Sequence, residues 1–231
     1  LIEADPQPTI SLTKDGDLGL VLNRDGYQSI DELAKDELRI AGTRLDPVRY
    51  TSSRMTYYKS FSLLDTKSGE NISVDFPLNG KFSFFQWSPN EEKIAFTNTT
   101  DDGVELWVLD IKSKTSKKVS DRYINDILNS PFQWYNSSDE LLVSLRSNKK
   151  KPIISSVPSG PIIQETTDQN APSRTYQDLI KNKNDEIYFE HYASIELHKM
   201  SLNGSSEMIQ NGMIKDFDLS PDNEFLMTKT I

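Results

Sequence analysis

The sequence predicts an all-β fold: a β-propeller of several four-stranded antiparallel blades, with short helical inserts and an incomplete ring. Three observations predict it. A motif of an apolar residue, a turn and a strand occurs four times, a second motif recurs in phase with it, and the second motif repeats with a period of about 45 residues, as in a propeller blade. We therefore expect residues 1–231 to form one partial propeller domain.

The first motif is an apolar residue, a tight polar turn and an apolar strand. Its clearest copy is 87–97, where Pro89 presets φ for the turn and Asn90 tolerates turn angles. The apolar run 94–96 then has the length and flanks of a buried strand. The other copies are residues 12–21, 134–143 and 219–228.

The second motif is a strand, a turn and another short strand. Residues 61–70 match residues 106–115, and residues 197–204 are a looser third copy. The step from the first copy to the second is about 45 residues, and the third copy follows after about two such steps. Two motifs that repeat in phase indicate one repeated structural unit.

Two irregular segments interrupt the repeat. In the first, Ser29 is a plausible N-cap and Glu32 its capping-box partner, so we predict a short amphipathic helix over 29–38 that packs against the sheets. Residues 40–54 then look irregular. The second segment, 162–194, is the least repetitive part of the second half of the chain.

Composition narrows the classes of function. Hydrophobic residues make up 35% and charged residues 26%, a balance typical of globular proteins. The net charge of -9 argues against binding to a nucleic-acid backbone, which needs clustered cations. No apolar run approaches the roughly 20 residues of a membrane span. The basic run 149–151 is interpreted as a solvated hairpin tip.

Motifs of catalysis and of cofactor binding are missing from the sequence. It contains no Gly-x-Ser-x-Gly elbow, no His-x-x-x-His pair, no phosphate-binding loop and no dinucleotide fingerprint. It also has no cysteine, which excludes disulfides and thiolate metal sites but leaves the compartment open. We predict no catalytic residue, no metal ligand and no cofactor in this chain.

The irregular segments resemble a known family. The residues that carry the resemblance are 31–34, 38–47, 53–54, 157–166, 171–180 and 185–193. They resemble the opening of the glutamyl-endopeptidase-like branch of the prolyl oligopeptidase family of serine peptidases. These segments are more specific than the blade turns, because the packing of a repeat does not require them.

The resemblance implies an N-terminal propeller that caps a C-terminal α/β-hydrolase carrying a Ser-Asp-His triad. This chain matches only the propeller side, so no catalytic residue is carried over and the chain alone is expected to lack peptidase activity. Its implied role is to gate and help bind peptide substrates, while the parent protein cleaves them after Glu.

The last copy of the repeat stops at Ile231 before its blade is complete. We therefore interpret the chain as a fragment of a longer protein, without the hydrolase domain. An unfinished blade leaves a strand edge unpaired, and such an edge favours self-association.

Two other functions remain open at the level of sequence. One is a stand-alone propeller that acts as a protein-interaction scaffold. The other is a sugar-processing propeller, which needs paired carboxylates facing a central pocket. Most acidic residues of this chain lie at turns, which disfavours the second alternative.

Arg44, Arg54 and Arg174 are the candidate substrate-binding residues. An enzyme that prefers an acidic side chain must neutralise a carboxylate, and the guanidinium fork does this with two hydrogen bonds. Each of the three lies in a non-repeat segment, where blade packing does not require it. The alternative is structural: such an arginine binds backbone carbonyls or a neighbouring acid such as Asp46 or Asp178.

Overall fold

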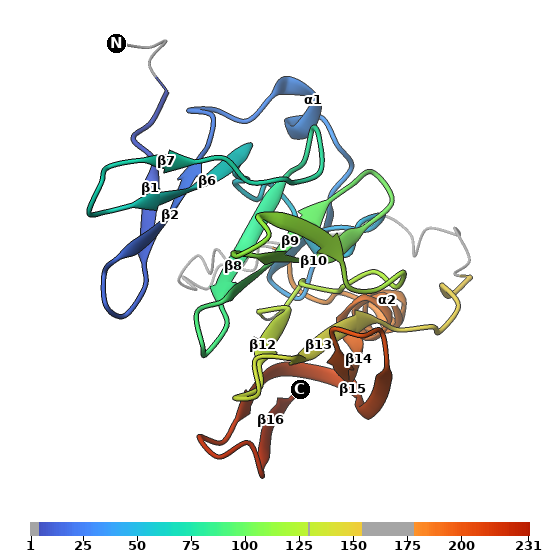
Figure 1. Ribbon diagram of the computed structural model, residues 1–231. Helices are drawn as coiled ribbons and strands as arrows, with labels where there is room; N and C mark the ends of the chain where they lie inside the picture. The colour runs from blue at the N-terminus through green and yellow to red at the C-terminus, as the bar shows by residue number, and fades with distance from the viewer. Residues whose placement is uncertain (1–4, 129, 154–177) are drawn as a thin grey trace, which may run out of the picture.

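The computed structural model describes residues 5–128, 130–153 and 178–231 (Figure 1). Strands in this part of the chain form four antiparallel sheets, and the helices there are two, α1 and α2. Three of the sheets follow one another along the chain as blades. The predicted all-β propeller fold is therefore confirmed.

Each blade runs through its strands in chain order. Blade 1 consists of β1 (Thr9–Leu12), β2 (Leu18–Asn23), β6 (Ser60–Asp65) and β7 (Asn71–Ile72). Blade 2 consists of β8 (Phe82–Trp87), β9 (Lys93–Thr99), β10 (Val104–Asp110) and β11 (Thr115–Lys118). Blade 3 consists of β12 (Phe132–Trp134), β13 (Glu140–Arg146), β14 (Ser194–Ser201) and the first half of β15 (Ser206–Leu219).

The long strand β15 belongs to two units. Up to Met213 it pairs with β14, and from Ile214 onward it pairs with β16 (Leu226–Thr230). Its second half is therefore the first strand of the next repeat. The fourth copy of the first motif, 219–228, joins these two strands.

The two sequence motifs occupy equivalent turns in every blade. The first motif joins the first and second strands, and the second joins the third and fourth. In each blade the residue just after the third strand donates its N–H to the carbonyl of the residue just before the second strand. The three pairs are Thr66 to Asp17 (3.1 Å), Ile111 to Glu92 (3.1 Å) and Leu202 to Asp139 (2.9 Å). The predicted phase of the repeat is therefore confirmed.

The first motif also connects each blade to the next. The contacts from turn to turn are Lys14 Nζ to Pro89 O (3.0 Å), Asn90 N to Ser138 Oγ (3.1 Å) and Asn136 Nδ2 to Pro221 O (2.6 Å). The tryptophans at the start of two of the copies each donate a hydrogen bond to the preceding blade. Trp87 Nε1 donates to Ser11 Oγ (3.0 Å), and Trp134 Nε1 donates to Gln86 O (3.2 Å). One motif thus forms both the turn and the contact between blades.

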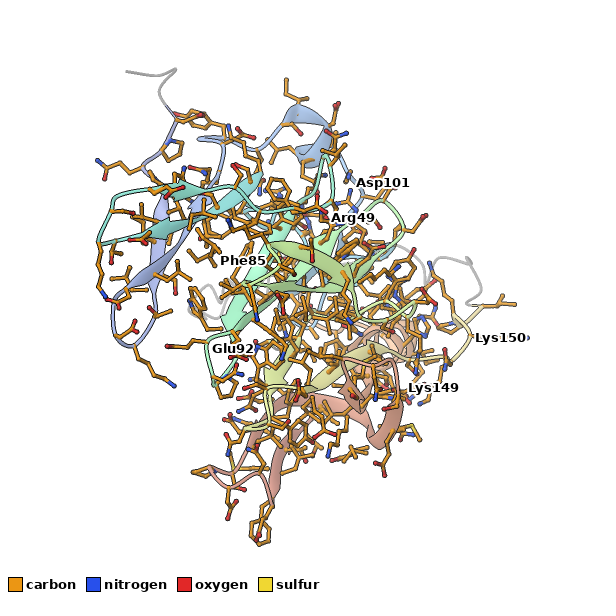
Figure 2. The ribbon with its side chains drawn as sticks, viewed as in Figure 1. Arg49, Phe85, Glu92, Asp101, Lys149 and Lys150 are labelled. Atoms are coloured by element: carbon orange, nitrogen blue, oxygen red, sulfur yellow. The ribbon has the colours of Figure 1, made fainter. Side chains whose placement is uncertain are left out.

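The core lies between the blades. Aromatic rings fill the space between blades 1 and 2, where Phe61 contacts Phe82, Phe85 and Phe96 at ring distances of 5.0–5.3 Å. Phe85 lies near the centre of the molecule in Figure 2. Aliphatic side chains such as Val104 fill the space between blades 2 and 3. Each blade therefore buries its faces only against its neighbours.

Both irregular segments leave their blades at the connection between the second and third strands. The first insert contains α1 (Ile30–Leu33), β3 (Leu38–Ile40), β4 (Thr43–Asp46) and β5 (Thr51–Ser52), and the second contains α2 (Lys183–Ala193). The inserts pack on each other, because Ile40 and Leu45 form a buried cluster with Tyr192 and with Ile127 from the connection between blades 2 and 3.

The prediction of a helix over 29–38 that packs against the sheets was wrong in length and in packing. Ser29 caps the helix as predicted, accepting a hydrogen bond from Glu32 N (3.2 Å). However, α1 ends at Leu33, and Ile30 and Leu33 are 83% and 50% exposed. Leu38 instead lies in β3, because pairing with β4 buries Ile40 in the insert cluster.

The interpretation of residues 40–54 as irregular was also wrong, since β3, β4 and β5 form a small three-stranded sheet there. Its strands have only two to four residues each, too few to show an alternating pattern. Over the described ranges, no helix is both long and apolar enough to cross a membrane.

The edge of β16 generates a testable prediction. β16 pairs with β15 along one edge, and among the described strands none pairs with its other edge. Phe225 and Met227 are exposed beside it. An unpaired apolar edge favours pairing with another chain, so we expect the isolated 231-residue chain to self-associate in light scattering. Met227→Lys should reduce the association, and a monomer at all concentrations would contradict the prediction.

Candidate functional site

A large cavity lies beside α1, on the side of the blades that carries the inserts. It has a volume of about 450 Å³ and is lined by residues 24–29, 55–59 and 79–81 together with Glu32. We call it the α1 groove. Ligand sites in proteins typically have volumes of about 300–1,000 Å³, so the α1 groove is large enough to bind a ligand.

Local backbone contacts hold the walls of the α1 groove. Gln28 Nε2 donates to the carbonyls of Arg54 (2.7 Å) and Met55 (2.6 Å), and these bonds connect segment 24–29 to segment 55–59. Tyr58 and Phe82 exchange two backbone hydrogen bonds of 2.9 Å, and these bonds connect segment 55–59 to β8. Gly80 is required because a Cβ there would lie 2.0 Å from the ring of Phe82.

Charged side chains line the α1 groove in pairs, with one exception. Lys59 binds Asp25 (2.6 Å), and Lys81 forms an ion pair with Glu32 and lies 5.9 Å from the centre of the Tyr57 ring. Arg24 forms no ion pair or hydrogen bond with any residue that the structure describes.

A buried arginine lies next to the α1 groove. Arg49 follows β4, and its Nη1 binds Glu32 Oε1 at 2.6 Å. Its Nη2 lies 3.4 Å from Asp101 Oδ1 in the turn between β9 and β10, and its Nε lies 3.6 Å from Asp46 Oδ2 (Figure 2). Burial raises the pKa of Glu32, but hydrogen bonds from Lys81 and Arg49 lower it more, so the net shift is downward. Arg49 thus joins α1, the insert sheet and blade 2.

Replacing Arg49 tests this role. Arg49→Met removes the cation beside the buried carboxylate of Asp46 and one of the cations that bind Glu32, which keeps Lys81 and Lys35. We expect the free energy of unfolding, measured with urea, to fall by about 3–5 kcal/mol. Arg39→Met is the control: Arg39 pairs with Glu37 at an exposed site, so the loss should stay below about 1 kcal/mol. Equal losses would contradict a special role for Arg49.

Asp126 is a fully buried carboxyl beneath the insert sheet. Its N–H donates to Tyr50 O (3.1 Å), but neither carboxyl oxygen has a hydrogen-bond partner among the described residues. Thr51 lies beside it, yet the Thr51 hydroxyl donates to Met55 Sδ at 3.1 Å. Burial raises the pKa of Asp126 to about 7. The carboxyl is therefore partly protonated near neutral pH.

The raised pKa of Asp126 predicts a pH dependence of stability. The folded state holds this proton more tightly than the unfolded chain, so the group favours folding at low pH. That contribution is lost as the pH rises from about 4 to about 7. Asp126→Asn imitates the neutral acid and has no carboxyl to ionise at this site. Its free energy of unfolding relative to that of the parent chain should therefore increase by roughly 2–3 kcal/mol between pH 5 and pH 8.

Denaturation with urea at a series of pH values measures the effect. Asp121→Asn, an exposed acid of the same connection between blades, is the matched control and should show little pH dependence relative to the parent chain. An Asp126→Asn difference that does not change with pH would contradict the prediction.

The structure describes two of the three predicted substrate-binding arginines. Arg44 lies in β4, and its Nε binds Asp178 Oδ2 at 3.3 Å, so it bridges the two inserts. Arg54 follows β5 and is half-exposed, with its Nε 3.3 Å from Glu37 Oε2. Arg174 lies outside the described residues.

Arg44 lies in the insert sheet, and Arg54 follows its last strand. Ser53 N donates to Arg44 O (2.9 Å), so the backbones of the two predicted positions are close together. Arg39 lies directly opposite Arg44 in the pairing of β3 with β4, which places both side chains on one face. The insert sheet therefore carries three arginines, of which Arg39 and Arg54 share Glu37 as their acid.

The second insert contains a helix that the sequence reasoning missed. Asn182 caps α2, accepting hydrogen bonds from the N–H groups of Asn184 and Asp185. An Asn followed by acidic residues in the first turn is a helix-start signal and was available in the sequence. Arg49 was missed as well, because sequence gives no sign that a loop arginine will be buried.

The end of α2 packs on the first insert. Tyr50 Oη lies 2.7 Å from His191 Nε2, and the guanidinium of Arg146 stacks 4.2 Å from the centre of the Tyr50 ring. Burial, with Lys151 and Lys149 nearby, lowers the pKa of His191, so the imidazole is neutral near pH 7 and can accept a hydrogen bond from the Tyr50 hydroxyl. Lys149 borders a smaller cavity of about 160 Å³ next to α2 (Figure 2).

No group of three or more His, Cys, Asp or Glu side chains that could hold a metal ion occurs in residues 5–128, 130–153 and 178–231. The arrangement beside α1 is instead suited to binding. It combines an open groove, tyrosine rings and the guanidinium of Arg24.

No protein-family model matches the chain. Two curated relatives do: a probable chloroplastic glutamyl endopeptidase of Oryza sativa subsp. japonica, 31% identical over 248 residues, and one of Arabidopsis thaliana, 29% identical over 250 residues. This chain is glutamyl endopeptidase-like. The resemblance inferred from the insert residues is thereby confirmed. The alignments cover 100% of this glutamyl endopeptidase-like chain but only 26% of each relative.

Solved structures similar to this glutamyl endopeptidase-like chain include an acylaminoacyl peptidase of Pyrococcus horikoshii. It is 14% identical with a TM-score of 0.43, and the match covers 90% of this chain and 24% of that one. Another is the β-propeller domain of the Trilobed protease from Pyrococcus furiosus, 12% identical with a TM-score of 0.36, where the match covers 98% of this chain and 72% of that one.

Proposed function

We propose that this chain is a non-catalytic propeller domain of a serine peptidase, which gates and helps bind peptide substrates for a hydrolase domain elsewhere in the same protein. The observation that carries the proposal is the alignment of the entire chain with about a quarter of the glutamyl endopeptidases (26%). The family resemblance implies that the Ser-Asp-His triad lies in the remaining part of such a protein.

The distribution of the inserts supports a gating role. Both inserts leave the blades at the same type of connection, and they pack together through Ile40, Leu45 and Tyr192. The blades bury their faces without these segments, so the inserts add a surface that the fold itself does not need. A surface of this kind, at one end of the blades, is suited to restricting access to a neighbouring domain.

Arg44, Arg54 and Arg174 remain the proposed residues for an acidic substrate side chain. Arg44 and Arg54 support this best, because both are partly exposed, and Ser53 next to Arg54 donates its N–H to Arg44 O. Each already contacts one carboxylate, Asp178 and Glu37 respectively. A guanidinium has five N–H donors, so it can bind a second carboxylate beside the first.

The experiment compares peptides with Glu or Gln at the cleaved position, using the full-length protein that contains this chain. We expect cleavage of the Glu peptide that a serine-directed reagent abolishes, and no cleavage by the 231-residue chain alone. Arg54→Ala should lower kcat/KM on the Glu peptide by roughly tenfold to a thousandfold, because a charge-assisted contact is lost. The loss should be much smaller on the Gln peptide.

Matched controls separate substrate binding from structure. Arg39→Ala removes the other arginine that binds Glu37 and should leave kcat/KM almost unchanged. For Arg44, the control is Asp178→Asn, which breaks the same ion pair from the other side. Equal losses on both peptides, or losses in the controls as large as those in Arg44→Ala and Arg54→Ala, would show that these arginines are structural.

A further inference from the structure

The α1 groove contains one cation, Arg24, that has no acid partner among the described residues. Three cations line it, Arg24, Lys59 and Lys81, against two anions, Asp25 and Glu32. Lys59 is paired with Asp25 and also with Asp5, and Lys81 is paired with Glu32, so Arg24 is the lining cation that has no acid partner among the described residues. This is unusual in a chain with a net charge of -9, in which acids outnumber bases 35 to 26. Arg24 is therefore available to bind an anionic group.

Large apolar side chains that line the α1 groove, or are next in sequence to its lining residues, are exposed. Tyr27 is 78% exposed and lines the groove, and Leu78, which precedes the lining residue Asn79, is 90% exposed. Ile30, the first residue of α1, is exposed beside the lining residue Ser29. Clustered exposed apolar side chains mark binding surfaces, and tyrosine and arginine are the residues that most often dominate such surfaces.

One wall of the α1 groove also offers a hydrogen-bond acceptor. Gln28 is held by its Nε2, which donates to Arg54 O and Met55 O. Its Oε1 accepts no hydrogen bond from any described residue, so it is available to a backbone N–H of a ligand. A fixed acceptor, a free guanidinium and an apolar rim together match an extended peptide that carries an acidic side chain.

We propose that the α1 groove binds an extended acidic segment of a peptide, with a carboxylate of the peptide on Arg24 and apolar side chains against Tyr27 and Leu78. This inference rests on the proposed role in handling peptides and adds a second recognition site for them. A nucleic acid fits the groove less well, because it requires several clustered free cations, and Arg24 is the one lining cation without a partner in the described residues.

The test uses the full-length protein with its serine nucleophile blocked by a covalent serine-directed reagent, so that binding is measured without cleavage. The probe is a fluorescein-labelled peptide that alternates Glu with Leu, and its matched partner has Gln in place of every Glu. Fluorescence anisotropy gives the Kd of both. We expect Arg24→Ala to weaken binding of the Glu peptide about tenfold or more and to leave the Gln peptide almost unchanged.

Two further variants complete the design. Tyr27→Ser should weaken both peptides, because both lose the apolar contact. Lys112→Ala is the charge-matched control: Lys112 is exposed in the turn between β10 and β11, at the opposite end of the blades from the groove, and it should leave both Kd values unchanged.

Distinct outcomes would overturn the two proposals. If Arg24→Ala weakens the Glu and Gln peptides equally, or acts no differently from Lys112→Ala, the α1 groove does not bind the acidic segment. If light scattering shows that Arg24→Ala instead abolishes self-association, the occupant is a second copy and the proposal is wrong. If the unblocked protein cleaves peptides but Arg24→Ala does not change the Kd of either peptide, only this inference is overturned. Absence of cleavage of every peptide overturns the proposed function, whatever the groove binds.

Discussion

The packing of one blade against the next is the constraint on which the rest of this molecule depends. A single four-stranded blade has two faces and cannot bury both by itself, so each blade is stable only with a neighbour. The rings of Phe61, Phe82 and Phe96 fill one such interface. The repeated turn adds hydrogen bonds from blade to blade at its tips, as from Lys14 to Pro89 O. Apolar burial supplies the driving force, and the turn contacts set the register between blades.

Because the repeated turns lie at one end of the blades, the connections at the opposite end can differ in length and sequence. Turns at the motif end are short because they carry the contacts between blades. Connections between second and third strands lack the repeated turn, and two of the three hold the inserts. Contacts between blades at this end come from individual side chains instead, as from Arg146 Nη2 to Asp102 O (3.3 Å). The inserts then form their own core around Tyr192 and Leu45, which fixes them relative to the blades. Any surface for substrates has to be built there, since the motif end is used by the fold.

Electrostatics in the inserts reflects the cost of burying charge. Arg49 is buried with three acids around it, so its charge is neutralised by side chains from two different sheets. Asp126 has no such cation, and the result is a raised pKa, because desolvation disfavours the carboxylate. Arg24 remains in solvent, where it needs no partner. Burial thus decides the state of each charged side chain: Arg49 is held by ion pairs, Asp126 has a raised pKa, and Arg24 stays exposed and unpaired among the described residues.

The repeat, the turn types and the all-β class could be predicted from the sequence, because each depends on residues a few positions apart. Pro89 and Asn90 determine their turn locally, and Ser29 determines where α1 begins. The resemblance of the irregular segments to glutamyl-endopeptidase-like proteins could also be recognised from the sequence, because the repeat does not require the residues that carry it.

Tertiary structure decided what the local pattern left open. Residues 29–38 were compatible with one helix, but pairing of β3 with β4 brings Ile40 and Leu45 into a shared core, and only the second insert supplies the partner Tyr192. The partners of Arg44 and Arg54 are set by the same folding. The α1 groove joins segments 24–29, 55–59 and 79–81, which are far apart in sequence. The sequence alone determined the repeating unit, because its signals are local; the structure decided the site, because burial and charge pairing depend on which distant segments meet.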